Sequence, residues 1–395
     1  MIKRKKKNKE HNPFYDPTLK KRHVSAKRFK KFTLTSLIFS VAFLAFFLFD
    51  MIGKGIPAFN IAYIKTDVTF NEKTLEDTRF AVPTEYRNLV SRAALRDLPK
   101  LLEENPTYMN STQNIWILAS SQVDQYIKNH NHNLKDKDIA KVDELYAQGL
   151  IDKKFNAIFF ENGDSKIPEY AGIFSAVIGS ILTLIITMAV AFPIGVMTAI
   201  YLEEFAGDNK FTRFIEININ NLAAIPSILF GLLGLAIFIN LFGIPRSSPL
   251  VGGLTLALMT LPIIIVSSRA ALRAVPDSIR QAGYGLGLNK IQVTRDHVLP
   301  LAFPGIMTGS IIGLAQAMGE TAPLIIIGMI AFIPDAPSMV TQAATVMPAQ
   351  LFTWAGMPEG MYIEKTAAGI LVLLTILISL NAIAIFLRKK FEVKW

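Results

Sequence analysis

The feature that most constrains the fold is a series of six long apolar runs without an acidic or basic residue. Because an α-helix rises 1.5 Å per residue, about 17–25 apolar residues are enough to cross a bilayer. In chain order the runs are 32–49, 171–202, 217–245, 247–268, 299–319 and 366–387. The fifth continues to about residue 334, interrupted only by Glu320. The sequence therefore predicts an all-α, polytopic membrane protein with six transmembrane helices.

The formal net charge of +10 is concentrated at one end of the chain. Residues 1–31 hold thirteen Lys or Arg against two acids, and the remainder is close to neutral. This pattern favours a disordered cytoplasmic tail, attracted to lipid headgroups, over a nucleic-acid-binding surface. The long basic leader and the lack of a small-x-small site after the first run predict an uncleaved membrane anchor.

The short loops predict the orientation of the helices. Lys or Arg residues follow the second, fourth and sixth runs, whereas the short loops of the opposite side offer only Arg246 and Lys365. By the positive-inside rule, both termini and the loop 269–300 are predicted to be cytoplasmic. Residues 53–170 are then predicted to lie on the outer side of the membrane.

The outer segment is predicted to be a small α/β domain. Asn60–Phe70 and residues 154–160 are expected to be strands, while 84–102 and 137–148 have helical periodicity. His130 and His132 form a His-x-His pair, yet no Cys and no clear carboxylate accompanies them. A solvated polar loop is therefore predicted there rather than a metal site. The chain contains no cysteine, so no disulfide is expected.

The charged loop after the fourth run has internal order. Ile279, Ala282 and Leu286 recur at helical spacing after Asp277, a candidate N-cap that follows Pro276. The sequence predicts a short amphipathic helix over 276–288, of the kind that lies in a groove of a partner protein.

The same loop resembles a known motif. Gln281-Ala282-Gly283, then Gly287, then His297-x-Leu299-Pro300 resemble the EAA loop of bacterial ABC-transporter permeases, with Gln281, Gly283 and His297 in place of the commoner Glu, Ala and Ile. In that family the loop docks on the ATPase subunit. The resemblance assigns ATPase coupling to Ile279, Gln281, Ala282, Gly283, Leu286, Gly287, Leu299 and Pro300.

A second motif sharpens the resemblance. The hexapeptide Gly319-Glu320-Thr321-Ala322-Pro323-Leu324 is similar to the phosphate-specific permeases of the PstA family. The resemblance implies the ABC-importer permease fold, placed as a multi-pass subunit in the bacterial cytoplasmic (inner) membrane. It further implies a sister permease subunit, two ATPase subunits, a periplasmic phosphate-binding protein and inorganic phosphate as substrate. No cofactor is implied.

Charge, hydropathy and the resemblance, which covers mainly residues 171–395, together divide the chain. They predict a basic tail at 1–31, a first transmembrane helix at 32–52, a periplasmic α/β insertion at 53–170, a permease core at 171–387 and a second cytoplasmic tail at 388–395. Most PstA-like permeases have only a short connection where the insertion lies, so this chain resembles a long-form branch of the family.

Moving phosphate requires hydrogen-bond donors. The candidate path residues are Ser227, Ser267, Ser268, Gln316, Glu320 and Thr321. Pro226 and Ser227 are expected to break a helix at membrane depth, which exposes N–H groups. Gln316 stands where many phosphate permeases carry Arg, so a direct Arg contact from this subunit is not expected. Three roles stay open for Glu320: acceptor for protonated phosphate, ion-pair partner of an Arg on the sister subunit, or structural pin.

No Walker A, His-Glu-x-x-His or Gly-x-Ser-x-Gly motif occurs, so ATP hydrolysis is expected from a separate subunit and not from this chain. Two alternative functions remain: a permease for sulfate, molybdate or an organic solute, and a non-transporting membrane sensor. The coupling loop disfavours a sensor, and the hexapeptide at 319–324 favours phosphate.

Overall fold

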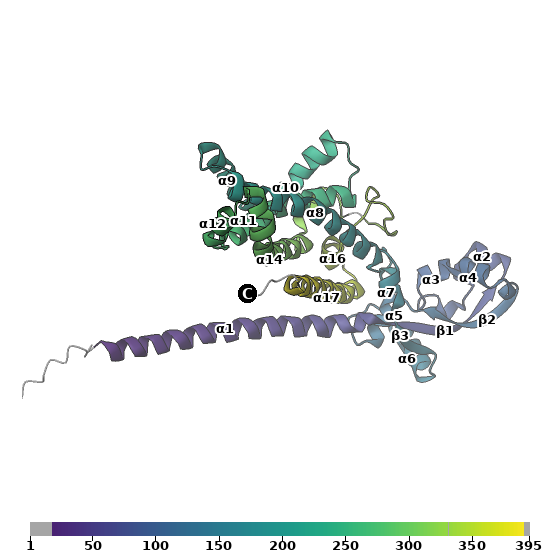
Figure 1. The fold of residues 1–395 in the computed structure, drawn as a ribbon. Helices are drawn as coiled ribbons and strands as arrows, with labels where there is room; N and C mark the ends of the chain where they lie inside the picture. Colours follow the sequence, from purple (N-terminus) through teal and green to yellow (C-terminus); the bar gives the residue numbers. More distant parts are fainter. Residues whose placement is uncertain (1–17, 331, 391–395) are drawn as a thin grey trace, which may run out of the picture. The chain divides into compact units, whose positions relative to one another are not determined.

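The computed structural model describes residues 18–330 and 332–390 (Figure 1). The chain divides into two compact units, residues 1–53 and 54–395. In the first unit the described residues form helix α1 (Leu19–Gly55), which ends two residues into the second unit. Residues 19–31, predicted to be a disordered tail, are therefore helical, because no Gly or Pro interrupts the chain there. The rest of that tail and residues 391–395 lie outside the described residues.

The predicted transmembrane helices agree well with the structure. Among the described residues, five helices are long and apolar enough to cross a membrane: Leu19–Phe59, Phe174–Phe205, Pro249–Arg273, Lys290–Gly319 and Gly360–Lys390. A sixth span results if the bent pair Lys210–Ala223 and Ser227–Leu241 is counted as one. The prediction of an all-α, multi-pass membrane protein with a small α/β insertion is confirmed.

The third apolar run is not one straight helix. It is divided between α9 (Lys210–Ala223), α10 (Ser227–Gly234) and a π-helical segment, η7 (Leu235–Leu241), and the chain bends by 104° between α9 and α10. Pro226 is the N-cap of α10. Because proline has no N–H and disfavours helical geometry in the residue before it, the break expected at Pro226 occurs there.

The remaining spans form the centre of the helical core. Helix α11 (Pro249–Arg273) packs against both α8 (Phe174–Ile200) and α14 (Leu299–Gly319). The contact with α14 is close: a Cβ built on Gly309 would lie 1.9 Å from Ser267 Oγ. Small residues at such crossings let helix backbones approach in membrane proteins.

The helix formed by the fifth apolar run ends earlier than the hydropathy of the sequence indicated. Glu320 is the C-cap of α14 in extended conformation, and only the short helix α15 (Ala322–Ile326) follows before an irregular segment. The continuous apolar segment to residue 334 is therefore not a continuous helix. Helix α16 (Met347–Ala355) was not predicted, and α17 (Gly360–Lys390) begins six residues before the sixth run.

An inserted domain, residues 56–173, separates α1 from α8. In its described residues a three-stranded antiparallel sheet has the order β2-β1-β3. The strands are β1 (Asn60–Phe70), β2 (Ser111–Leu118) and β3 (Ile151–Phe155), and the helices are α2 (Glu72–Glu76), α3 (Arg92–Arg96), α4 (Leu98–Glu104), α5 (Ser121–Ile127), α6 (Asp136–Ala147) and α7 (Ala157–Glu161). Alternate residues of β1, including Ile64 and Val68, face the apolar core under these helices.

The four local predictions for this domain have different outcomes. The helical stretch expected at 84–102 is divided among a 3-10 turn (Thr84–Tyr86), α3 and α4. The first strand is confirmed with its bounds, and α6 confirms the helix expected at 137–148. The second strand prediction, 154–160, is wrong after Phe155, because the Asn156 side chain caps α7 by accepting a hydrogen bond from Phe159 N–H at 3.2 Å. This cap overrides the strand preference of the apolar residues that follow it.

The inserted domain is fixed to the start of α17 by buried polar contacts. Glu364 accepts hydrogen bonds from Gln125 Nε2 at 2.6 Å and from Lys128 Nζ at 2.8 Å. The buried Lys365 ammonium donates to the carbonyls of Pro168 at 2.7 Å and Ala171 at 2.6 Å. Lys365, which the sequence placed in a short loop, is thus a structural residue at the base of the domain.

Candidate functional site

The predicted amphipathic helix exists as α12 (Asp277–Gly285). Its N-cap is Pro276, which makes no side-chain capping bond, so the prediction that Asp277 caps the helix is wrong. Asp277 is the first helical residue, and its Oδ1 accepts a hydrogen bond from Arg280 at 3.2 Å. An acid in the first turn still interacts favourably with the helix dipole.

Helix α12 ends in a turn that requires a glycine. Gly287 has a φ of +80°, in the left-handed region, and its N–H donates to Tyr284 O at 2.9 Å. A Cβ there would meet no atom within 4 Å, so a substitution would be strained by backbone conformation alone. Gly283 differs, because its Cβ would lie 2.8 Å from Val293 Cγ2.

One face of α12 borders an open apolar pocket of about 520 Å³. The pocket is lined by Ala271, Ala274, Val275, Pro276, Ile279, Ala282, Gly283, Leu286, His297 and Leu301. Four of the predicted coupling residues lie in this lining, and Leu286 is 81% exposed. Gln281, Gly287, Leu299 and Pro300 lie outside it. The loop thus presents a solvent-accessible apolar hollow between α12 and the facing ends of α11 and α14.

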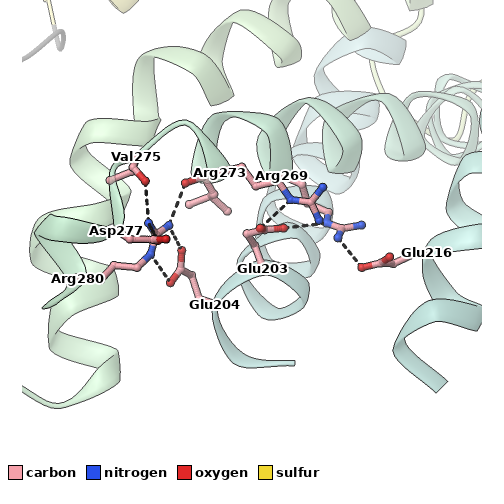
Figure 2. A network of polar contacts seen from close by, with 9 residues as sticks. Glu203, Glu204, Glu216, Arg269, Arg273, Val275, Asp277 and Arg280 are labelled. Atoms are coloured by element: carbon pink, nitrogen blue, oxygen red, sulfur yellow. Dashed lines mark hydrogen bonds and ion pairs between the residues drawn. The ribbon is translucent and has the colours of Figure 1, made fainter. Parts of the chain in front are cut away.

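Another side of α12 is held by a partly buried arginine, Arg280 (Figure 2). Arg280 Nη2 lies 2.7 Å from Glu204 Oε1, and its Nε lies 3.3 Å from Oε2 of the same carboxylate. The guanidinium also donates to the carbonyls of Val275 at 2.8 Å and Leu272 at 3.0 Å. The side chains of Arg280 and Glu204 are only 15% and 4% exposed. The hydrogen bond to Glu204 raises the pKa of Arg280, so the guanidinium stays charged.

A second ion-pair group lies next to this contact, as Figure 2 also shows. Glu203 accepts hydrogen bonds from Arg269 at 3.3 Å and from Arg273 at 2.8 Å, and Arg269 also pairs with Glu216 of α9. Glu203 and Glu204 belong to η6 (Tyr201–Phe205), the π-helical end of α8. The ends of α8, α9 and α11 are thereby joined to α12.

These pairings were not predicted from the sequence. The available signal was two consecutive acids, Glu203 and Glu204, at the end of an apolar run, and arginines spaced four residues apart at the end of another. Which acid meets which arginine depends on the crossing of α8 and α11, which no local pattern specifies.

The predicted path residues are not gathered in one place. Ser227 begins α10, whereas Ser267 and Ser268 lie in α11. Ser267 Oγ donates to Ile263 O at 2.7 Å, and the buried Ser268 Oγ has no hydrogen-bond partner among the described residues. Gln316 is exposed on α14.

Glu320 and Thr321 lie at the break between α14 and α15. Within residues 18–330 and 332–390, the Glu320 carboxylate has no hydrogen-bond or ion-pair partner. Helix α10 packs on α15, and a Cβ on Gly231 would lie 2.8 Å from Pro323 Cα. The broken third span therefore contacts the segment that carries Glu320.

An arginine near the end of α17, Arg388, contacts the span formed by α14. Arg388 Nη1 donates to Thr308 Oγ1 at 3.0 Å. Thr308 precedes Glu320 by twelve residues, or about 18 Å along α14 at 1.5 Å per residue. Arg388 is therefore too far from Gln316 and Glu320 to replace an arginine at that level.

The two histidines of the inserted domain lie apart from any metal-like cluster. His130 Nδ1 is 3.8 Å from Glu364 Oε2, and the His132 ring meets the Tyr126 ring edge-on with centroids 4.9 Å apart. In the described part of the chain, no three His, Cys, Asp or Glu residues are grouped as ligands of a metal ion would be.

Comparison with known proteins identifies relatives of the helical core. The family "Binding-protein-dependent transport system inner membrane component" matches residues 191–393. A domain family of unknown function, DUF3333, matches residues 16–86 and 81–136. The phosphate transport system permease protein PstA of Mycobacterium leprae is 36% identical over 40% of this chain and 52% of its own length.

Other relatives extend the match. The phosphate transport system permease protein PstA of Yersinia pestis is 30% identical over 61% of this chain and 81% of its own length. The chain spans about half the length of the mycobacterial relatives. Among solved structures, an inward-facing MetNI methionine ABC transporter is 15% identical and covers 56% of this chain and 95% of its own, with a TM-score of 0.43. The family match covers half of this chain, so the chain belongs to the binding-protein-dependent transport system inner membrane components, and among them to the PstA-type permeases.

Proposed function

We propose that this chain is the membrane-spanning permease subunit of an ATP-driven importer of inorganic phosphate. The PstA-type relatives at 30–36% identity support this substrate. Its partners would be a sister permease subunit, two ATPase subunits and a periplasmic phosphate-binding protein. The clustering of positive charge supports a bacterial inner-membrane location with α12 and both termini cytoplasmic and the inserted domain outside.

The observation that carries the proposal is the two-sided environment of α12. One side borders an open apolar pocket with exposed Leu286, which suits the apolar surface of an ATPase subunit. Another side is fixed by Arg280 to Glu204 and to the carbonyls of Val275 and Leu272. A force applied through the pocket would therefore reach the transmembrane helices. The chain itself is not an enzyme, and the ATPase partner supplies hydrolysis.

The contacts define a route for that force. Glu204 ends α8, and Leu272 and Val275 belong to the end of α11, so displacement of α12 pulls on both helices. Helix α11 in turn packs closely on α14 where Ser267 meets Gly309. These three helices move as one body, which provides the rocking motion of alternating access.

The phosphate path is assigned to the two helix breaks. Ser227 follows the bend between α9 and α10, Thr321 follows the end of α14, and α10 packs on α15. Interrupted helices supply N–H and hydroxyl donors at membrane depth, which an anion requires. Glu320, without a partner in the described chain, is available to accept a proton from phosphate or to pair with an arginine of the sister subunit.

The test is transport by the complete complex. The chain is reconstituted with its sister permease, ATPase and binding protein in vesicles, and ATP-dependent uptake of radiolabelled phosphate is measured. Uptake should depend on this chain and should resist excess sulfate or molybdate. Equal competition by sulfate would indicate a different anion importer, and phosphate uptake that is unchanged without this chain would refute the proposal.

A further inference from the structure

Three phenylalanine rings form a stack at the base of the inserted domain. The rings of Phe59 and Phe160 lie with centroids 5.8 Å apart and an interplanar angle of 10°. Those of Phe160 and Phe155 are also 5.8 Å apart, at 7°. Phe155 is 64% exposed and Phe160 36% exposed. The stack, called here the aromatic ladder, thus runs outward from the domain and ends in an uncovered ring.

Only the Phe59 end of the ladder packs against the apolar core, whereas Phe155 and Phe160 are exposed. The neighbouring Phe159 is fully buried, meets Phe160 edge-on at 5.1 Å and packs toward Trp354, so it fills the core role in this segment. Phe155 belongs to β3, which lies at the edge of the sheet and pairs only with β1 among the described strands. An exposed stack of large apolar rings beside a membrane span indicates a contact surface.

Hydrogen bonds hold α7 and the ladder at the level where two spans end. Asn156 N–H donates to Phe59 O at 2.8 Å, and Phe59 ends the helical segment Leu19–Phe59, ten residues after the apolar run 32–49. On the other side, Ile173 N–H donates to Phe159 O and Phe174 N–H to Asn162 O, both at 2.9 Å. Phe174 is the first residue of the next span. These bonds join α7 directly to the start of α8, so the ladder lies near the level at which α8 enters the apolar region of the bilayer.

Basic side chains accompany the exposed rings. Lys153 is exposed two residues before Phe155 in β3, and exposed Lys166 lies 5.8 Å from the exposed Phe332 ring in a cation–π contact. Aromatic rings flanked by lysines are typical of the membrane–water boundary, where the rings enter the acyl region and the ammonium groups meet phosphate headgroups.

We propose that the aromatic ladder is a lipid-binding surface, which seats the base of the inserted domain in the phospholipid interface on that side of the membrane. Phe155 and Phe160 enter the boundary between headgroups and acyl chains, and Lys153 contacts lipid phosphates. The inserted domain is then held at two places, by α17 through Glu364 and Lys365 and by lipid through the ladder.

The absence of cysteine makes this directly testable. Single variants Phe155→Cys and Phe160→Cys of the full chain carry a nitroxide label in vesicles of phosphatidylethanolamine and phosphatidylglycerol. Phe80→Cys is the matched control, because Phe80 is also an exposed aromatic residue, at 58%, in the same domain. Phe80 also lies far from the ladder. The next residue, Ala81, is hydrogen-bonded to Thr69, and at 3.3 Å per residue Thr69 is about 30 Å along β1 from the end of the strand next to the ladder.

Collisions of each label with oxygen, which concentrates in lipid, and with a water-soluble nickel chelate are then compared. The labels at 155 and 160 should collide with oxygen several times more often than with nickel, and the label at 80 should show the reverse. Nickel access at 155 and 160 equal to that at 80 would overturn the proposal. Protection of both labels from both reagents in the assembled transporter would also overturn it, since a protein partner would then cover the ladder.

Discussion

Replacing Arg280 by Met tests whether α12 is fastened to the transmembrane helices. The substitution keeps an unbranched apolar side chain but removes the guanidinium that binds Glu204 and two backbone carbonyls. Removal of one partner of a fully buried ion pair costs about 3–5 kcal/mol. The Arg280 side chain is 15% exposed, so we expect the substitution to weaken the attachment of α12 by about 3 kcal/mol, the lower end of this range.

A loss of about 3 kcal/mol corresponds to roughly a hundredfold larger population of detached α12, at 1.4 kcal/mol per factor of ten. Hydrogen exchange followed by mass spectrometry on peptides that cover α12 should therefore lose about two orders of magnitude of protection. ATP-driven uptake should fall with it, while the chain still inserts and assembles. The matched control is Arg295→Met, because within the described residues Arg295 pairs only with the exposed neighbouring Asp296. Wild-type exchange and uptake in Arg280→Met would refute the proposed transmission.

Three further predictions concern glycines and Glu320. Gly287→Leu should abolish ATP-driven uptake without blocking insertion, because a residue with a side chain pays about 1–2 kcal/mol to adopt a φ of +80°. The control Gly285→Leu should transport normally, because Gly285 has open space around it and no positive φ. Gly309→Ala should lower the free energy of unfolding by about 1–3 kcal/mol, because the new methyl group clashes with Ser267. The double variant Gly309→Ala with Ser267→Gly should regain this stability. If the charge of Glu320 acts in transport, Glu320→Gln should abolish uptake while the amount of the chain in the membrane stays normal. A fully active Glu320→Gln variant would refute a role of this charge in transport.

Hydropathy predicted the helical core because the bilayer imposes a minimum length on every span. The break within the third run was indicated instead by Pro226, which lacks the N–H donor that a helix needs. The helical period of Ile279 and Ala282 predicted α12, but not its cap, since Pro276 and Asp277 are both acceptable first residues. For these elements local patterns specified the position to within a few residues, whereas α16 was not predicted.

The contacts that join these elements were not predictable in the same way. The pairing of Arg280 with Glu204 joins residues 76 positions apart, and that of Lys128 with Glu364 joins residues 236 apart. Lys365 illustrates the difficulty: its charge suggested a solvated loop, yet three backbone carbonyls satisfy it inside the fold. Burial of such a group depends on partners that only the assembled tertiary structure supplies.

The attachment of the inserted domain to Lys365 has a consequence for biosynthesis. The carbonyl of Ala171 precedes Lys365 by 194 residues, so at about 5–20 residues per second its partner is translated roughly 10–40 s later. During that interval Lys128 lacks its ion-pair partner Glu364, and the carbonyls of the turn at 168–171 lack the Lys365 ammonium that they bind in the finished protein. The base of the domain, although encoded early, is completed only when the last helix has been made. A nascent chain released before α17 therefore carries a domain whose base lacks the contacts of Glu364 and Lys365.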